Sequence, residues 1–562
     1  MMSAVMRRLR LSFQFSDLIL VILAVAFTAM GFFVDRGLLP AHLFLLVPAG
    51  FLLAAVFGMV VRWDARAFLS ASVLGGALLL AFATVSFSKP TPLEQDIASK
   101  VKLAAIVFPI ALLLLAGLRM LWQETSPPRA GFPPLAAALL VGGYSFAALC
   151  LHWLKFYPSG TSPDTRHQWG QIHGTLTLND IHALGHTVFL KGLLAIWDSY
   201  AFVILVHILM ISLLYALFAH YLAGKGIPLG WMLLGVSLFT ACGTLSWVYM
   251  YPWKDTPYTF AVGILTLMLI HLTDERMGFG VPKAVLLGIS LAYTTLFRLN
   301  GVVILLFVGG WLAVWYIRRR RWRQLCATAL AAFTCFGAVN FYGYKVLKAE
   351  SPANGFSVQV FASGLSAVVS QSVRTMAPEE RQELSQLLPT KWMIEHYAPW
   401  DTKQLIWQYE TFDPDGIFDD PNMEIMVNKF VLTLGENKGE TIKLYLKLAP
   451  KHLAVCIRDI LYNTYRVWGF SSWNQFFYEN IFLLVLLMVG VGAVWRRKEM
   501  AARLAVFAPV VLNAVSIAIS TITNEERYLL PSFTLFPVLL LYLFSTAQGA
   551  RRLAFGNIFG KK

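Results

Sequence analysis

The chain has 562 residues, of which 57% are hydrophobic and only 14% are charged, and it contains 41 Phe and 17 Trp. Soluble domains carry about 25% charged residues, so this composition excludes a soluble globular enzyme, a disordered chain and a fibrous protein. A mean hydropathy of +0.62 indicates a membrane protein instead. The 46 basic and 31 acidic residues give a net charge of +15, and the placement of those charges decides between a nucleic-acid patch and a membrane topology.

Apolar runs long enough to cross a membrane recur along the chain. A hydrocarbon core of about 30 Å takes about 20 apolar residues per crossing. The sequence predicts about fourteen transmembrane helices, near 16–34, 42–61, 68–87, 103–122, 134–153, 199–219, 229–250, 257–273, 281–298, 301–317, 325–345, 478–495, 503–522 and 529–546. The pair 281–298 and 301–317 is the least distinct, because only Leu299 and Asn300 separate the two runs.

The basic residues orient these helices. If the N-terminus with Arg7, Arg8 and Arg10 is cytoplasmic, every strong basic cluster falls in a cytoplasmic loop, including the run that begins at Arg318. Positive residues near the ends of spans favour the inside. We therefore expect both termini in the cytoplasm and interpret the positive charge as topological, with membrane lipids and no nucleic acid as partners.

Loop lengths divide the chain into four parts. Residues 1–153 are predicted N-terminal spans, 154–345 a core with an outward loop at 154–198, 346–476 a mainly helical outward segment, and 477–562 the C-terminal spans. In the outward segment Pro378 is predicted to open a helix, and 440–468 could lie along the membrane surface. No Asn-x-Ser/Thr sequon occurs, which favours a bacterial cytoplasmic membrane. The five cysteines have no metal-ligand spacing and are interpreted as packing residues.

The first outward loop contains the sequence Ser-Pro-Asp-Thr-Arg-His-Gln-Trp. Asp164 follows a proline at a predicted helix start, where a carboxylate can cap free amides. Alternatively Asp164 is a general base, which works best when its surroundings raise its pKa towards the operating pH. Arg166, Gln168 and Trp169 lie beside it as candidate substrate contacts.

A second polar cluster follows in the same loop, at Asp180, His182 and His186. The histidines are four residues apart, which predicts a shared helix face, and such sets can hold a divalent metal. Zinc sites usually need more ligands, so a hydrogen-bonded structural cluster or contacts to an acceptor is favoured, and metal dependence stays open.

Cations recur at the predicted outer ends of later spans. They are Lys254 beside Asp255, Arg298 near Asn300, and Arg527 between Glu526 and Tyr528. Snorkelling explains a single arginine of this kind, and Lys254 could simply pair with Asp255. Outward arginines nevertheless oppose the positive-inside bias, and a guanidinium pairs well with phosphate oxygens. A substrate with a phosphate head and a lipid tail fits these parts.

Five motifs occur in one order between about residues 155 and 535. They are Ser-Pro-Asp-x-x-x-Gln-Trp (162–169), Asn-Asp-x-His followed by His-Thr (179–187), Trp-Lys-Asp-x-Pro (253–257), Phe-Arg-x-Asn-Gly (297–301) and Glu-Arg-Tyr-x-x-Pro (526–531). So arranged, the sequence resembles the polytopic GT-C type glycosyltransferases of bacteria, in a branch with a long late outward segment.

The resemblance implies an all-α GT-C-like membrane fold and a transferase whose active site faces the periplasm. Such enzymes move a sugar from a polyprenyl-phosphate donor to an envelope glycan or lipid acceptor, usually with inversion. The base would be Asp164, or else Asp180. Lys254, Arg298 and Arg527 would hold the donor phosphate. A flippase and a cytoplasmic transferase that loads the carrier are pathway partners implied in the same way.

Two other classes compete with this interpretation. One is an O-antigen ligase or polymerase that uses a lipid-diphosphate glycan and needs no early Asp. The other is a transporter or flippase of lipid-linked glycans, but transporters usually place polar residues at mid-membrane, and the predicted spans are nearly free of charge.

Overall fold

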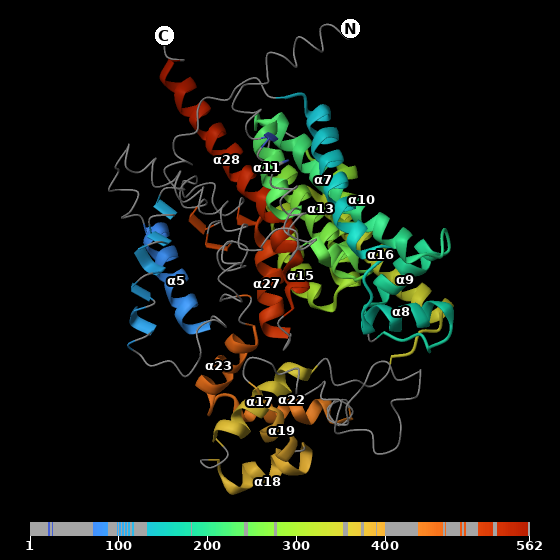
Figure 1. The fold of residues 1–562 in the computed structure, drawn as a ribbon, viewed down its shortest axis with the longest axis vertical. Helices are drawn as coiled ribbons and strands as arrows, with labels where there is room; N and C mark the ends of the chain where they lie inside the picture. Colours follow the sequence, from blue (N-terminus) through green and yellow to red (C-terminus); the bar gives the residue numbers. More distant parts are fainter. Residues whose placement is uncertain are drawn as a thin grey trace.

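The computed structural model describes residues 71–87, 132–180, 182–240, 246–274, 278–351, 358–372, 376–388, 390–398, 436–464, 504–520 and 525–559, with scattered residues between 21 and 116 and between 467 and 489. In these ranges the regular elements are helices, and the one pairing of extended backbone is a bridge between Asn179 and Glu350. The predicted all-α membrane class is consistent with this fold (Figure 1). The predicted run at 42–61 and almost all of the runs at 16–34 and 478–495 lie outside the described residues.

Five helices in the described ranges are long and apolar enough to cross a membrane. They are α7 (Pro134–Phe156), α10 (Tyr200–Gly224), α13 (Asp255–Thr273), the continuous stretch Leu299–Arg318 that contains α15 (Val302–Arg318), and Trp322–Val346, which contains α16 (Trp322–Phe341). Shorter apolar helices accompany them: α5 (Ala71–Phe87), α9 (Leu184–Leu194), α11 (Leu229–Thr240), α14 (Val281–Phe297) and α27 (Ala508–Ser520). The last helix, α28 (Leu530–Phe559), runs past the predicted end at residue 546.

One predicted span differs in detail from the structure, and one uncertain pair agrees with it. The predicted runs 281–298 and 301–317 are two separate helices, α14 and α15, joined by the 3-10 turn η4 (Leu299–Gly301). The run 229–250 is described as α11 followed by a separate 3-10 turn, η2 (Trp247–Met250). A 3-10 turn tightens the chain where an α-helix cannot continue, so both turns place polar loop residues near helix ends.

Helix α13 is the most deeply buried of the five. It packs against α10, α14, α27 and α28, and α7 covers the other side of α10. Polar contacts join the middle of the chain to the last helix within this core, because Tyr215 and Tyr249 both hydrogen-bond to Thr534 of α28. Figure 1 shows α28 running beside α11 and α13 along the length of the helix bundle.

The predicted outward segment forms a separate helical unit. It contains α17 (Gln359–Ser372), α18 (Pro378–Leu387), α19 (Thr390–His396), α22 (Lys438–Leu448) and α23 (Leu453–Asn463), around an apolar core of its own. The prediction that Pro378 opens a helix is confirmed. Helices α17 and α23 contact α27, so this unit meets the bundle at one end (Figure 1).

Candidate functional site

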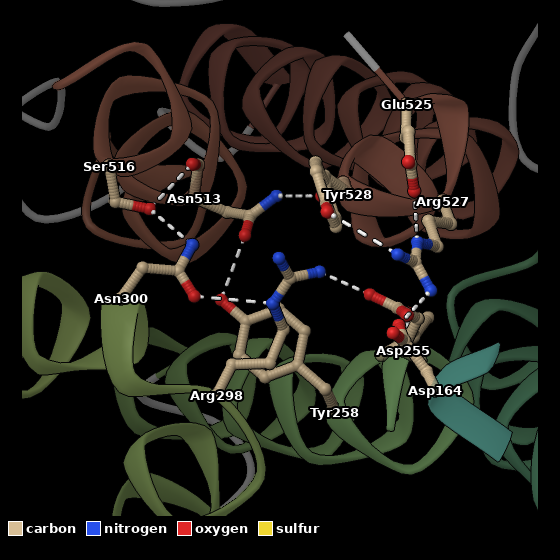
Figure 2. Close-up of polar contacts among 11 residues, drawn as sticks. Asp164, Asp255, Tyr258, Arg298, Asn300, Asn513, Ser516, Glu525, Arg527 and Tyr528 are labelled. Atoms are coloured by element: carbon tan, nitrogen blue, oxygen red, sulfur yellow. Dashed lines mark hydrogen bonds and ion pairs between the residues drawn. The ribbon is translucent and has the colours of Figure 1, made fainter. Parts of the chain in front are cut away.

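A single charged network joins four parts of the chain at one end of the bundle (Figure 2). Helix α8 (Pro163–His173) supplies Asp164, and the start of α13 supplies Asp255. The turn between α14 and α15 supplies Arg298. The 3-10 turn η9 (Glu526–Leu529) supplies Arg527. The site therefore crosses the predicted boundary between the core and the C-terminal spans.

Asp164 pairs with a cation rather than capping its helix. The cap of α8 is Ser162, whose Oγ accepts from the Thr165 amide at 3.2 Å, so the capping interpretation of Asp164 is wrong. Asp164 Oδ2 instead accepts from Arg527 Nη1 at 2.9 Å. Arg527 Nε also lies against Glu525, and one guanidinium therefore serves two carboxylates.

A second, deeper ion pair lies beside the first. Arg298 Nη1 donates to Asp255 Oδ1, and the two side chains are 7% and 0% exposed. The alternative pairing of Asp255 with Lys254 is not found. Tyr528 lies between the two arginines, with its ring centre 4.5 Å from Arg298 Cζ and 5.2 Å from Arg527 Cζ. Such contacts stabilise a partly desolvated cation, so both arginines are held in place rather than snorkelling.

Neutral hydrogen bonds fix the same turn to α27. Arg298 Nε donates to Asn300 Oδ1 at 3.2 Å, and Asn300 Nδ2 donates to Ser516 at 3.0 Å. Asn513 accepts from the Tyr258 hydroxyl at 2.8 Å and donates to the Tyr528 carbonyl at 3.1 Å. These bonds make the network a rigid junction of α13, α14, α27 and η9 (Figure 2).

Lys254 differs from the two arginines. Its side chain is half-buried, and its ammonium has no hydrogen bond or ion pair with the part of the chain that the structure describes. Its charge nevertheless acts on both Asp164 and Arg298. A partly desolvated cation without an ion-pair partner is a candidate contact for an anionic ligand.

The electrostatics of Asp164 oppose the expectation of a raised pKa. Burial by itself raises the pKa of this carboxyl, but the charges of Arg527 and Lys254 and the Arg527 hydrogen bond outweigh burial and lower the pKa below its ordinary value. Asp164 is therefore ionised and a weak base while Arg527 holds it.

Three buried histidines lie on α8, on α9 and in the segment between them. The rings of His167 and His182 are 5.2 Å apart, and both are buried. Burial and the charge of Lys254 lower the pKa of His182 to about 3, so its ring is neutral. His186 bonds to Gln168 at 3.1 Å, and Gln168 donates to Thr187, which ties α8 to α9.

The predicted histidine face is wrong, because α9 begins at Leu184 and His182 precedes it. Among the described residues, no three His, Cys, Asp or Glu side chains are placed to hold a metal ion.

Asp180 and Trp169, two other predicted site residues, have their contacts outside this network. Asp180 accepts from the Tyr344 hydroxyl and from Ser351, both at 2.7 Å, next to the bridge with Glu350. Trp169 stacks on Tyr200, with ring centres 3.6 Å apart. Arg166 is exposed on α8. Glu526 lies in η9, and its side chain is outside the described residues.

Sequence reasoning missed several members of the network. Glu526 is the predicted site residue, whereas its neighbour Glu525 pairs with Arg527. The sequence does not show which of two adjacent glutamates in a short turn faces the arginine. Asn513 stands alone in an apolar run, and an isolated amide inside a span is a usable signal. The remaining members that were missed are Trp253, Tyr258 and Ser516.

No protein-family model, curated protein or solved structure matches this chain.

Proposed function

We propose that this chain is a membrane glycosyltransferase of GT-C type that transfers a sugar from a polyprenyl-phosphate donor to an envelope glycan or lipid acceptor. Asp164 is the general base, and Lys254 with Arg527 and Arg298 holds the donor phosphate. One observation carries the proposal: Asp164 lies in a network with three cations at one end of an apolar bundle. One of these cations, Lys254, has no ion pair with a carboxylate among the described residues.

The chemistry needs few groups. A phosphate is a good leaving group, so the protein has to orient donor and acceptor, accept one proton and stabilise the charge that develops on the phosphate. A positioned base contributes about 10²–10⁴-fold to such a step, and cations aimed at the developing charge contribute similar factors. Asp180, the other candidate base, is bound to Tyr344 and Ser351 away from the cations, so Asp164 is preferred.

The proposal extends to topology. About fourteen spans in a bacterial cytoplasmic membrane, with both termini cytoplasmic, put the network on the periplasmic face. Such a face has no nucleotide sugars, which explains why a lipid-linked donor is required. A cysteine-accessibility scan with Asp198→Cys in the first outward loop and Arg320→Cys in a predicted cytoplasmic loop tests this orientation in intact cells.

The reaction is tested with purified wild type and Asp164→Asn in nanodiscs, given a synthetic polyprenyl-phosphate hexose and crude cell-envelope glycan. The expected result is acceptor-dependent release of polyprenyl phosphate by wild type and none by the variant. Asp180→Asn is the matched control and should retain release. Absence of release with several sugars, together with specific binding of a lipid-diphosphate glycan, would instead support a ligase or a transporter.

A further inference from the structure

Among the described side chains of the site, carboxylates and cations are equal in number. Lys254, Arg298 and Arg527 carry three positive charges when Lys254 is protonated, and Asp164, Asp255 and Glu525 carry three negative ones. A bound phosphodiester adds one negative charge to a partly buried network that is already neutral. Such a charge is costly unless a proton or a rearranged ion pair compensates it.

Each nitrogen of the Arg527 guanidinium faces a partner. Nη1 donates to Asp164, Nε lies against Glu525, and Nη2 is 3.4 Å from the Tyr528 hydroxyl. The Trp253 ring lies 4.4 Å from Cζ and covers one face. A phosphate that binds at Nη1 of Arg527 therefore competes with Asp164.

Asp164 is the partner of Arg527 that a phosphate would displace. The charge of Lys254 acts on the Asp164 carboxylate, and the same carboxylate accepts from Arg527 Nη1. Asp164 is also 32% exposed, whereas the Arg298 pair is closed by Asp255 at 0% exposure. The more exposed ion pair, Arg527 with Asp164, can open without disturbing the buried pair of Arg298 with Asp255.

On the premise of the function proposed above, we propose that the donor phosphodiester binds by taking Arg527 from Asp164, and that this exchange turns the freed carboxylate into the active base. Loss of its guanidinium and gain of an anionic neighbour both favour the protonated form of Asp164. The base is thus weak without donor and becomes effective only when a donor is in place.

The step balances in charge and atoms. The acceptor hydroxyl gives its proton to Asp164, its oxygen bonds to the anomeric carbon, and the bond between that carbon and the phosphate oxygen breaks. The leaving phosphate gains one negative charge, and Arg527 and Lys254 are then placed to stabilise it. Asp164 is neutral at that point, so it does not compete for Arg527.

Binding should therefore be coupled to partial proton uptake by Asp164, and the fraction that stays ionised acts as the base. The groups that face this carboxylate are Arg527 from η9, Lys254 before α13, His182 before α9 and His167 on α8. Of these, His182 and Lys254 could also take up a proton when an anion binds, so the test must separate them from Asp164.

The experiment measures the affinity of full-length protein in nanodiscs for a short-chain prenyl phosphohexose between about pH 5.5 and 7.5. This probe is a phosphodiester and lacks the second phosphate proton that titrates near pH 6. Wild type should bind more tightly as the pH falls, and calorimetry in two buffers should show proton uptake. Asp164→Asn should bind about tenfold more tightly at pH 7.5, because the competitor for Arg527 is weakened, and with no pH dependence over this range.

Glu525→Gln is the matched control. It removes the other carboxylate from Arg527, so binding should tighten while the pH dependence remains. A pH dependence that persists in Asp164→Asn assigns the proton to His182 or Lys254 and overturns the exchange. Affinity in Asp164→Asn equal to or below that of wild type also overturns it. No binding by wild type and by both folded variants would instead reject the phosphate site itself.

Discussion

Arg527 and Asp164 are separated by 363 residues of sequence, and Arg527 Nη1 donates to Asp164 Oδ2 at 2.9 Å. This contact joins helix α8 to the turn η9 before the last helix. Arg527 also touches Glu525, so the arginine is a shared counter-ion rather than one half of an isolated pair. The site can be tested as a network for this reason.

Replacing Arg527 by Gln should leave two partly buried carboxylates without a counter-ion. We expect a loss of about 2 kcal/mol in the free energy of unfolding, between the values for exposed and fully buried pairs, and at least 10²-fold in transfer rate. Thermal unfolding in nanodiscs and the release assay measure the two effects. Adding Asp164→Asn should recover part of the stability but none of the activity. Additive losses would show that the two side chains are not coupled.

The buried ion pair of Arg298 with Asp255 should contribute more to the free energy of unfolding than the pair of Arg527 with Asp164. Asp255→Asn leaves Arg298 charged in a site that is 7% exposed, which should cost about 3–5 kcal/mol. Asp274→Asn is the control, because Asp274 pairs with Lys225 at side-chain exposures of 16% and 22%, and its loss should cost nearer 1 kcal/mol. Thermal unfolding of the two variants under one condition gives the comparison, and equal losses would contradict it.

The helical unit at 358–464 should lose stability as the pH rises. Asp459 is buried and accepts from Ser363, Tyr397 and Asn463, and burial raises its pKa to about 6. The folded unit then holds a proton that the unfolded unit releases, so stability falls between about pH 4 and pH 6, by roughly 3 kcal/mol in total.

Asp459→Asn should remove that dependence. The measurement follows thiol labelling of Cys456, which is 2% exposed in the folded protein, by mass spectrometry at increasing urea concentration. The urea midpoint of labelling is compared between wild type and variant at each pH. A midpoint in wild type that rises with pH over this window would show the opposite sign and contradict the assignment.

Gly301 is expected to tolerate no side chain. A Cβ there would lie 1.9 Å from the Thr294 carbonyl oxygen, so Gly301→Ala must displace the turn that carries Arg298 and Asn300. We expect a loss of about 2 kcal/mol or more in stability, with activity falling further. Gly310→Ala in the next helix is the control, because a Cβ at Gly310 meets nothing within 4 Å. Equal behaviour of the two variants would show that close packing does not position Arg298.

The sequence predicted the helices well because composition and length decide them. Helix α7 begins at Pro134 and α10 at Tyr200, each within one residue of its predicted start. Turns were less predictable, since a 3-10 turn such as η2 is apolar like the helices around it. The five spans found in the described residues agree in kind with the predicted architecture.

The site was predicted as a set of residue types but not as pairs. Asp164, Lys254, Arg298 and Arg527 were all expected to act together. The sequence could not show that Arg527 binds Asp164, because that distance depends on the packing of α13, α27 and α28. It also could not show that Ser162 rather than Asp164 caps α8. Only the structure shows that Asp180 binds Tyr344 rather than one of the cations.

The 363 residues between Asp164 and Arg527 also set an order of assembly. At about 5–20 residues per second, a ribosome needs roughly 20 to 70 s to pass from one to the other. During that interval helix α8 has been made while the counter-ion of Asp164 has not. A chain arrested before Glu525 would carry most of the bundle but no complete site, so the turn before the last helix decides whether the newly made protein can become active.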